Sequence, residues 1–162
     1  MLFRSGFMTA LFFALIGMIY ERTHTRDVTK LGGLLKVLPF ISVIYVIAGL
    51  ASLGLPGFSG FIAEMNIFVG AFQHDNMFYR VATIISVSAI LVTAVYILRV
   101  VGIMLMGPVK NEAYLNLEKV TWYEKTGILL LLIPIVGIGV APLWLSNMIL
   151  ESLQPFIQGV LQ

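Results

Sequence analysis

The feature that most constrains this chain is a long apolar run from Pro39 to Phe72, 34 residues that hold one charged side chain, Glu64. As one helix the run would extend roughly 50 Å, whereas the hydrocarbon core of a bilayer is about 30 Å thick. Proline removes a backbone donor, and glycine accepts dihedral angles that other residues avoid. The sequence therefore predicts a helix broken near residues 54–60. The residues expected to form this break are Gly54, Pro56, Gly57 and Gly60.

The composition is that of a membrane protein. Hydrophobic residues make up 59% of the 162 positions, charged residues only 11%, and the mean hydropathy is +0.99. A soluble core does not need that much apolar sequence. The charges gather between the apolar runs, so the formal charge of +2 bears on membrane topology before nucleic-acid binding.

The chain has no cysteine and two histidines that are far apart in the sequence. A disulfide framework and a cysteine-ligated metal or iron–sulfur centre are thereby excluded. The histidines form no recognisable metal motif, so no metal site and no cofactor are expected in this chain. Any redox chemistry would belong to partner chains.

We expect an all-α integral membrane protein with four transmembrane helices in one domain over residues 1–162, the second helix discontinuous. The predicted spans are residues 1–20, 39–72, 78–105 and 126–149. A signal peptide at residues 1–20 is the alternative for the first span, but residues 17–20 are not a small-residue cleavage site. The first span is also short, as if its beginning were missing, which favours a fragment of a longer subunit.

Charge placement predicts the topology. The connections 21–36 and 107–125 are basic and should both be cytoplasmic, while the bend at 73–80 carries only Arg80. Both basic connections lie on one side only if residues 39–72 cross the membrane once. A re-entrant hairpin would place them on opposite sides. We therefore expect one discontinuous crossing and both termini outside.

Glu64 is the strongest candidate for chemistry. A carboxyl group in a low-dielectric helix bundle takes up and releases protons as water or a nearby cation comes and goes, which is what a proton relay needs. The alternative is that Glu64 is held in a fixed ion pair or serves packing only. Gly57 and Gly60 are open to two interpretations, a hinge or close helix packing.

Four other residues are weaker relay or water-holding candidates: Ser5, His24, Tyr96 and Arg99. His24 stands in a basic loop, either as a proton-uptake group or as a solvated surface histidine. Arg99 is either a relay member or an interfacial anchor whose charged head reaches the membrane surface. His74, in the opposite bend, is either a group that takes a proton at the exit or a surface residue.

Two strings carry a family resemblance: YERTHTRDVTKLGGL at residues 20–34 and ASLGLPGFSGFIAEMNIFVGAF at residues 51–72. They resemble the C-terminal part of the antiporter-like, proton-pumping subunit M (chain 4 in mitochondria) of respiratory complex I, NADH:quinone oxidoreductase. The resemblance implies the last four of fourteen helices, and it implies that Glu64 is the proton-exchange group on the broken helix. Pro56 and Gly57 match the family's break. Ser5 departs from the family pattern, which has a histidine there, and a serine carries no charge at neutral pH.

The resemblance also implies partners and location. NADH, FMN, iron–sulfur clusters and quinone would be held by other subunits, and neighbouring membrane-arm subunits, including other antiporter-like ones, would contact this chain in the bilayer. The expected location is the bacterial plasma membrane, or the inner mitochondrial membrane for an organellar protein. Two alternatives stay open: a subunit of a multisubunit sodium/proton antiporter or membrane-bound hydrogenase, and a structural remnant that does not pump. Ser5 and the absence of counterparts to the family's first ten helices favour the remnant.

Overall fold

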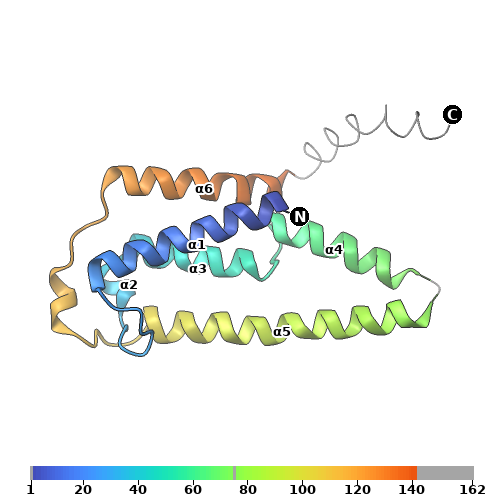
Figure 1. Cartoon of the computed structure of the whole chain (residues 1–162), viewed down its shortest axis with the longest axis horizontal. Coiled ribbons are helices and arrows are strands. Elements are labelled where there is room, and N and C mark those ends of the chain that lie inside the picture. Colours follow the sequence, from blue (N-terminus) through green and yellow to red (C-terminus); the bar gives the residue numbers. More distant parts are fainter. Residues whose placement is uncertain (1, 75, 142–162) are drawn as a thin grey trace.

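A computed structural model describes residues 2–74 and 76–141, and this part of the chain is helical without any strand (Figure 1). Its elements follow the chain in the order α1 (Leu2–Thr23), α2 (Leu34–Val37), α3 (Pro39–Ser52), α4 (Ser59–Phe72), α5 (Met77–Leu105), the 3₁₀ helix η1 (Glu112–Asn116) and α6 (Trp122–Val140).

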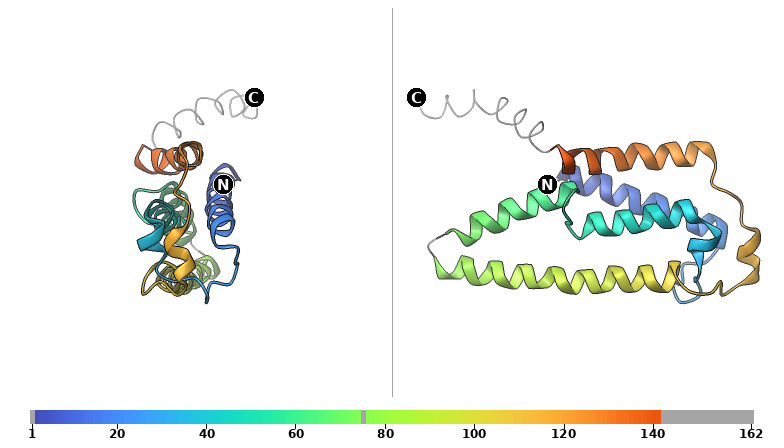
Figure 2. Two further views of the ribbon diagram at one scale, coloured as in Figure 1. Left: turned by 90° about the vertical axis from the view of Figure 1, so that its left-hand side faces the viewer. Right: turned by 180° about the vertical axis from the view of Figure 1, so that it is seen from behind.

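Helices α3 and α4 follow one another in the same direction, and together they run antiparallel to the longer α5 (Figure 1). Seen down the bundle, α6, the α3–α4 pair and α5 form a stack, with α1 beside it (Figure 2). Helix α1 contacts α3 and α6, and α4 contacts α6 as well as α5. The interrupted pair is therefore the centre of the bundle.

The buried core lies where α1, α3 and α6 meet. Leu11 and Leu15 of α1, Ile41 and Ala48 of α3, and Ile128 of α6 are at most 2% exposed. Burying a leucine or isoleucine side chain contributes about 1.5–3 kcal/mol, so this cluster fixes how the three helices pack. Only the C-terminal end of α5 joins the cluster, through Val101, Met104 and Leu105.

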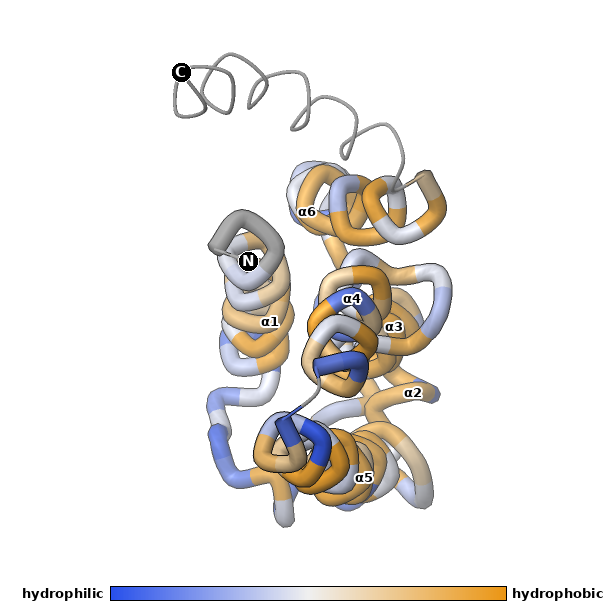
Figure 3. Tube along the Cα trace, turned by 90° about the vertical axis from the view of Figure 1, so that its right-hand side faces the viewer, coloured by the Kyte–Doolittle hydropathy of each residue, from blue (hydrophilic) through white to orange (hydrophobic). Residues whose placement is uncertain are grey.

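The exterior of α5 is apolar and open. Ile85 and Leu91 are 65% and 70% exposed, and apolar residues, drawn in orange, make up much of every long helix (Figure 3). By length and hydropathy α5 and α6 can each cross a membrane, while α3 and α4 are shorter apolar helices. In a water-soluble protein such helices would bury their apolar faces. Lipid or the helices of a neighbouring protein can cover this apolar surface.

Several helix boundaries differ from the predicted ones. Helix α1 continues through Thr23, so residues 21–23, expected in the loop, are helical. Helix α6 begins at Trp122, because Thr121 and Glu124 form a capping box that starts the helix there. The predicted end of the last span, residues 142–149, lies outside the described residues.

The two basic connections meet at one end of the bundle, and the α4–α5 bend lies at the other (Figure 1). Gly33 donates a backbone hydrogen bond to Met106 O at 3.3 Å, and Lys110 Nζ donates to Thr29 O at 2.5 Å. If residues 39–72 pass through the bundle once, the two basic connections must lie at the same end. The structure places them there. Which side of a membrane this end faces stays a prediction.

Candidate functional site

The chain leaves helical geometry between Ser52 and Ser59. Gly54 and Gly57 have φ angles of +66° and +96°, a region that glycine enters without the steric cost of a Cβ. Short turn bonds hold the segment, with Gly54 N–H donating to Ala51 O at 3.2 Å. Pro56 is exposed between the two glycines. Gly60, expected in the break, lies instead in the first turn of α4, where it is buried.

Glu64 lies in the second turn of α4 and is half-buried. Its side chain returns to the interruption, because a Cβ placed on Gly54 would collide with Oε2 of Glu64 and would lie 3.0 Å from its Cδ. The carboxylate is therefore in contact with the α carbon of Gly54. The structure thus brings together two residues that the sequence singled out separately.

Helix α6 covers another side of the interruption. A Cβ on Gly139 would collide with the carbonyl oxygen of Gly57 and with the backbone of Phe58. Such a close approach of two backbones is open to a glycine and to no larger residue. The segment 53–58 is thus contacted by α4 on one side and by α6 on another, while Pro56 stays exposed.

The hydroxyl of Ser59, at the start of α4, is buried and has no hydrogen-bond partner among the described residues. Buried polar groups are usually paired, and one that is not marks a place that suits a water molecule. Non-helical backbone at membrane depth is tolerated only where protein or water satisfies it. A carboxylate at such a place can exchange protons with water.

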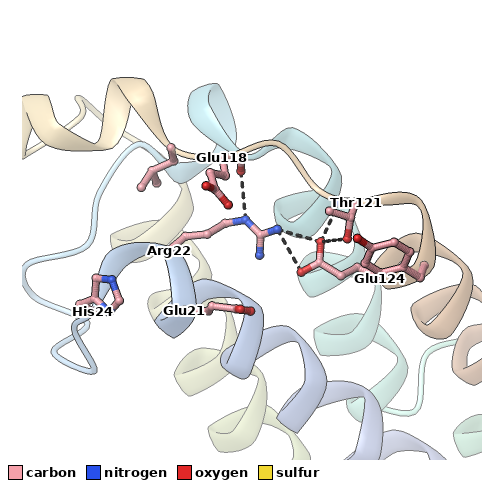
Figure 4. A pocket seen from close by; sticks show the side chains of 8 residues that line it. Glu21, Arg22, His24, Glu118, Thr121 and Glu124 are labelled. Carbon is pink, nitrogen blue, oxygen red and sulfur yellow. Dashed lines mark hydrogen bonds and ion pairs between the residues drawn. The ribbon is translucent and has the colours of Figure 1, made fainter.

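His24 lies far from this site, in a cleft of about 640 Å³ at the basic end of the bundle (Figure 4). It follows the last residue of α1 and has a φ of +50°, and its backbone N–H caps the helix by donating to Tyr20 O at 2.7 Å. The structure therefore does not bring His24 and Glu64 together. A proton-uptake role for His24 stays a prediction.

The same cleft contains an ion pair that sequence reasoning missed. Nη2 of Arg22 lies 2.8 and 3.0 Å from the two carboxylate oxygens of Glu124 (Figure 4). Nε donates to Glu118 O at 3.0 Å and Nη1 to Met18 O at 3.1 Å. The two bonds to Glu124 join the end of α1 to the start of α6, and the bond to Glu118 O ties α1 to the connection before α6. The capping-box spacing of Thr121 and Glu124 was readable from the sequence, but their partner in α1 was not.

The loop after α1 is held by its own side chains. Thr29 donates to Asp27 Oδ1 through its hydroxyl at 2.6 Å and its backbone N–H at 3.0 Å. These two bonds hold the pKa of the Asp27 carboxyl below its usual value. The guanidinium of Arg26 lies 4.7 Å from the ring centre of Tyr20. Side-chain contacts within the loop and with Tyr20 of α1 thus hold its conformation.

The remaining candidates are spread over the bundle. Tyr96 and Arg99 are exposed on α5, where Tyr96 borders a small apolar pocket of about 150 Å³ together with Phe12 and Tyr45. Ser5 is exposed near the start of α1. His74 follows α4, and its ring centre lies 4.4 Å from that of Tyr79. The structure leaves their predicted relay roles untested.

The described residues form an all-helical bundle with an apolar exterior, as expected for a membrane-embedded domain. A family model described as NADH:quinone oxidoreductase/Mrp antiporter, transmembrane, matches residues 1–93, more than half of the chain. The chain therefore belongs to this family, which confirms the resemblance drawn from residues 20–34 and 51–72.

Relatives and a solved structure agree with this assignment. Subunit M of NADH-quinone oxidoreductase from Rickettsia bellii is 30% identical over 142 residues, 88% of this chain and 28% of the relative. Chain 4 of NAD(P)H-quinone oxidoreductase from Trichormus variabilis is 35% identical over 142 residues, 85% of this chain and 26% of the relative. Respiratory complex I from Thermus thermophilus with bound NADH matches with a TM-score of 0.66 and 26% identity, over 79% of this chain and 26% of that one. The chain thus spans less than a third of each relative.

Proposed function

We propose that this chain takes part in proton translocation within the membrane arm of an NADH:quinone oxidoreductase, coupled to electron transfer in other subunits. The observation that carries the proposal is the contact of the Glu64 carboxylate with the helix interruption at Gly54. The relatives named above are quinone oxidoreductase subunits, which favours this function over a sodium/proton antiporter.

In this proposal Glu64 changes its protonation state as neighbouring charges and water rearrange at residues 53–58. Charging a carboxyl group in a low-dielectric surrounding is costly, so small changes in hydration or in a nearby charge shift its proton equilibrium. The non-helical backbone beside it offers polar groups that a continuous helix would use internally. Glu64 is then the proton-exchange group, and the interruption is the place where water reaches it.

The proposal extends to topology and partners. Helix α1, the α3–α4 pair, α5 and α6 each form one crossing, with the α3–α4 pair as the discontinuous one. NADH, FMN, iron–sulfur clusters and quinone are held by partner subunits, and this chain has no cysteine with which to bind a cluster. The exposed apolar face of α5 meets lipid or neighbouring membrane-arm subunits. The bacterial plasma membrane is the proposed location.

The test is the Glu64→Gln variant in the assembled complex, reconstituted into sealed vesicles. We expect normal complex content and a lower ratio of protons moved to electrons passed from NADH to quinone, because glutamine has similar size but does not ionise. Glu21→Gln is the matched control, since Glu21 is an exposed carboxylate at the end of α1. An unchanged ratio in an assembled Glu64→Gln complex would refute the function proposed for Glu64.

A further inference from the structure

We propose that Gly54 is a positioning residue for Glu64: the space left by its missing side chain is the seat of the Glu64 carboxylate. This inference rests on the proton-exchange function proposed for Glu64 and adds a second residue to the same site. A Cβ at position 54 would collide with Oε2 of Glu64, with Cδ and Oε1 at 3.0 and 3.3 Å. Any residue larger than glycine would therefore displace the carboxylate or the turn.

The direction of the Glu64 side chain follows from helix geometry. Side chains of an α-helix lean toward its N-terminus. Helix α4 begins at Ser59, directly after the interruption, so a long side chain in its second turn reaches back over residues 53–58. Gly54 receives it because its left-handed φ of +66° turns the backbone at that point. The interruption thus leaves room for the carboxylate at Gly54.

Displacement of this carboxylate should be costly for proton transfer. A reacting group that is misplaced by about 1 Å can lose on the order of 100-fold in rate, because donor and acceptor must lie within hydrogen-bond reach. An added methyl group at position 54 forces a shift of that size. Gly54→Ala should therefore reduce pumping although it leaves the ionisable group in place.

Gly107 provides a matched control outside the interruption. Its φ of +92° is also in the left-handed region, but a Cβ added there meets nothing within 4 Å. Gly54→Ala and Gly107→Ala thus share the cost of an unfavourable backbone conformation. Only Gly54→Ala adds a collision with Glu64. A difference between the two variants therefore measures the effect of the collision apart from that of the backbone strain.

The experiment compares the reconstituted wild-type complex with Glu64→Gln, Glu64→Asp, Gly54→Ala, Gly107→Ala and the double variant Gly54→Ala/Glu64→Asp, and it measures protons moved per electron. We expect Gly54→Ala to fall toward the level of Glu64→Gln and Gly107→Ala to stay near wild type. Adding Gly54→Ala to Glu64→Asp should cause a smaller further loss than adding it to wild type, because aspartate is shorter by one methylene and leaves room for the methyl group. A merely structural role of Gly54 would give the same loss in both backgrounds.

The outcomes separate two failures. Wild-type pumping in Glu64→Gln would refute the proposed function and this inference with it. If Glu64→Gln loses pumping while Gly54→Ala matches Gly107→Ala, or if Gly54→Ala causes the same loss in the wild-type and Glu64→Asp backgrounds, only the role of Gly54 is refuted. Should Gly54→Ala prevent assembly, the double variant Gly54→Ala/Glu64→Ala decides: restored assembly supports the collision, and continued failure overturns it.

Discussion

Arg22 at the end of α1 and Glu124 in the first turn of α6 form an ion pair at 2.8 Å, although 102 positions separate them in the chain. Both side chains are largely buried, with 7% and 19% exposed. Two further donors of Arg22 bond to backbone carbonyls of Met18 and Glu118, so this guanidinium joins three segments. The pair fixes how α1 and α6, the two helices that flank α3, meet at the basic end.

Replacing Arg22 should weaken this junction. We expect Arg22→Ala to cost about 2 kcal/mol, because it removes several charge-assisted hydrogen bonds and leaves Glu124 without its cation. Arg22→Lys should recover only part of that loss, since a lysine ammonium cannot reach the same set of acceptors. The measurement is the temperature at which the purified complex releases this chain. Equal stability of Arg22→Ala and wild type would show that the pair is incidental.

Thr121 should matter through the helix start that it caps. Its backbone N–H and its hydroxyl each donate to Glu124 Oε2 at 2.7 Å. Thr121→Ala removes the hydroxyl and should cost about 1 kcal/mol, a typical value for a lost N-cap. Thr121→Ser keeps the hydroxyl and serves as the control in the same thermal measurement. Similar losses in both variants would place the effect in the threonine methyl group rather than in the cap.

Gly139 should be intolerant of a side chain, because α6 touches the interruption there. Gly139→Ala forces α6 away from Gly57 and Phe58, and overpacking of this kind costs about 1–3 kcal/mol. Gly137→Ala is the control, since a Cβ at that helical position meets nothing within 4 Å. We expect the first variant to lower the content of assembled complex and the second to leave it unchanged. Tolerance of Gly139→Ala would contradict the close approach.

Gly33 should be more sensitive than Gly107, although both have a positive φ, +68° and +92°. A Cβ on Gly33 would lie 2.7 Å from the backbone nitrogen of Val109, whereas one on Gly107 meets nothing within 4 Å. Gly107→Ala should therefore cost about 1–2 kcal/mol of backbone strain, and Gly33→Ala more than that. Thermal release from the complex measures both. A larger loss in Gly107→Ala would reverse the assignment of Gly33 as the contact between the two basic connections.

Residue types indicated where α3 and α4 are separated, while the roles of the site residues stay predictions. Gly54, Pro56 and Gly57 indicated an interruption because their backbone preferences are local, and the observed gap between Ser52 and Ser59 contains all three. Gly60 was placed wrongly in the break, since nothing in the local sequence prevents a glycine from entering a helix. The proton-exchange role of Glu64 stays a prediction. Its place in α4 followed from the apolar run, while its contact with Gly54 did not.

The sequence alone determined that the chain is helical and suited to a membrane, because hydropathy and backbone preference act over short stretches. Charge counting predicted that the two basic connections share one side of the membrane, and the structure has them at one end of the bundle (Figure 1). Tertiary structure decided which distant residues meet: Arg22 with Glu124, Gly139 with Gly57, and the Glu64 carboxylate with Gly54. The physical reason is that such contacts depend on helix rotation and interhelical distance. Packing of the whole bundle sets both, and no short stretch of sequence records them.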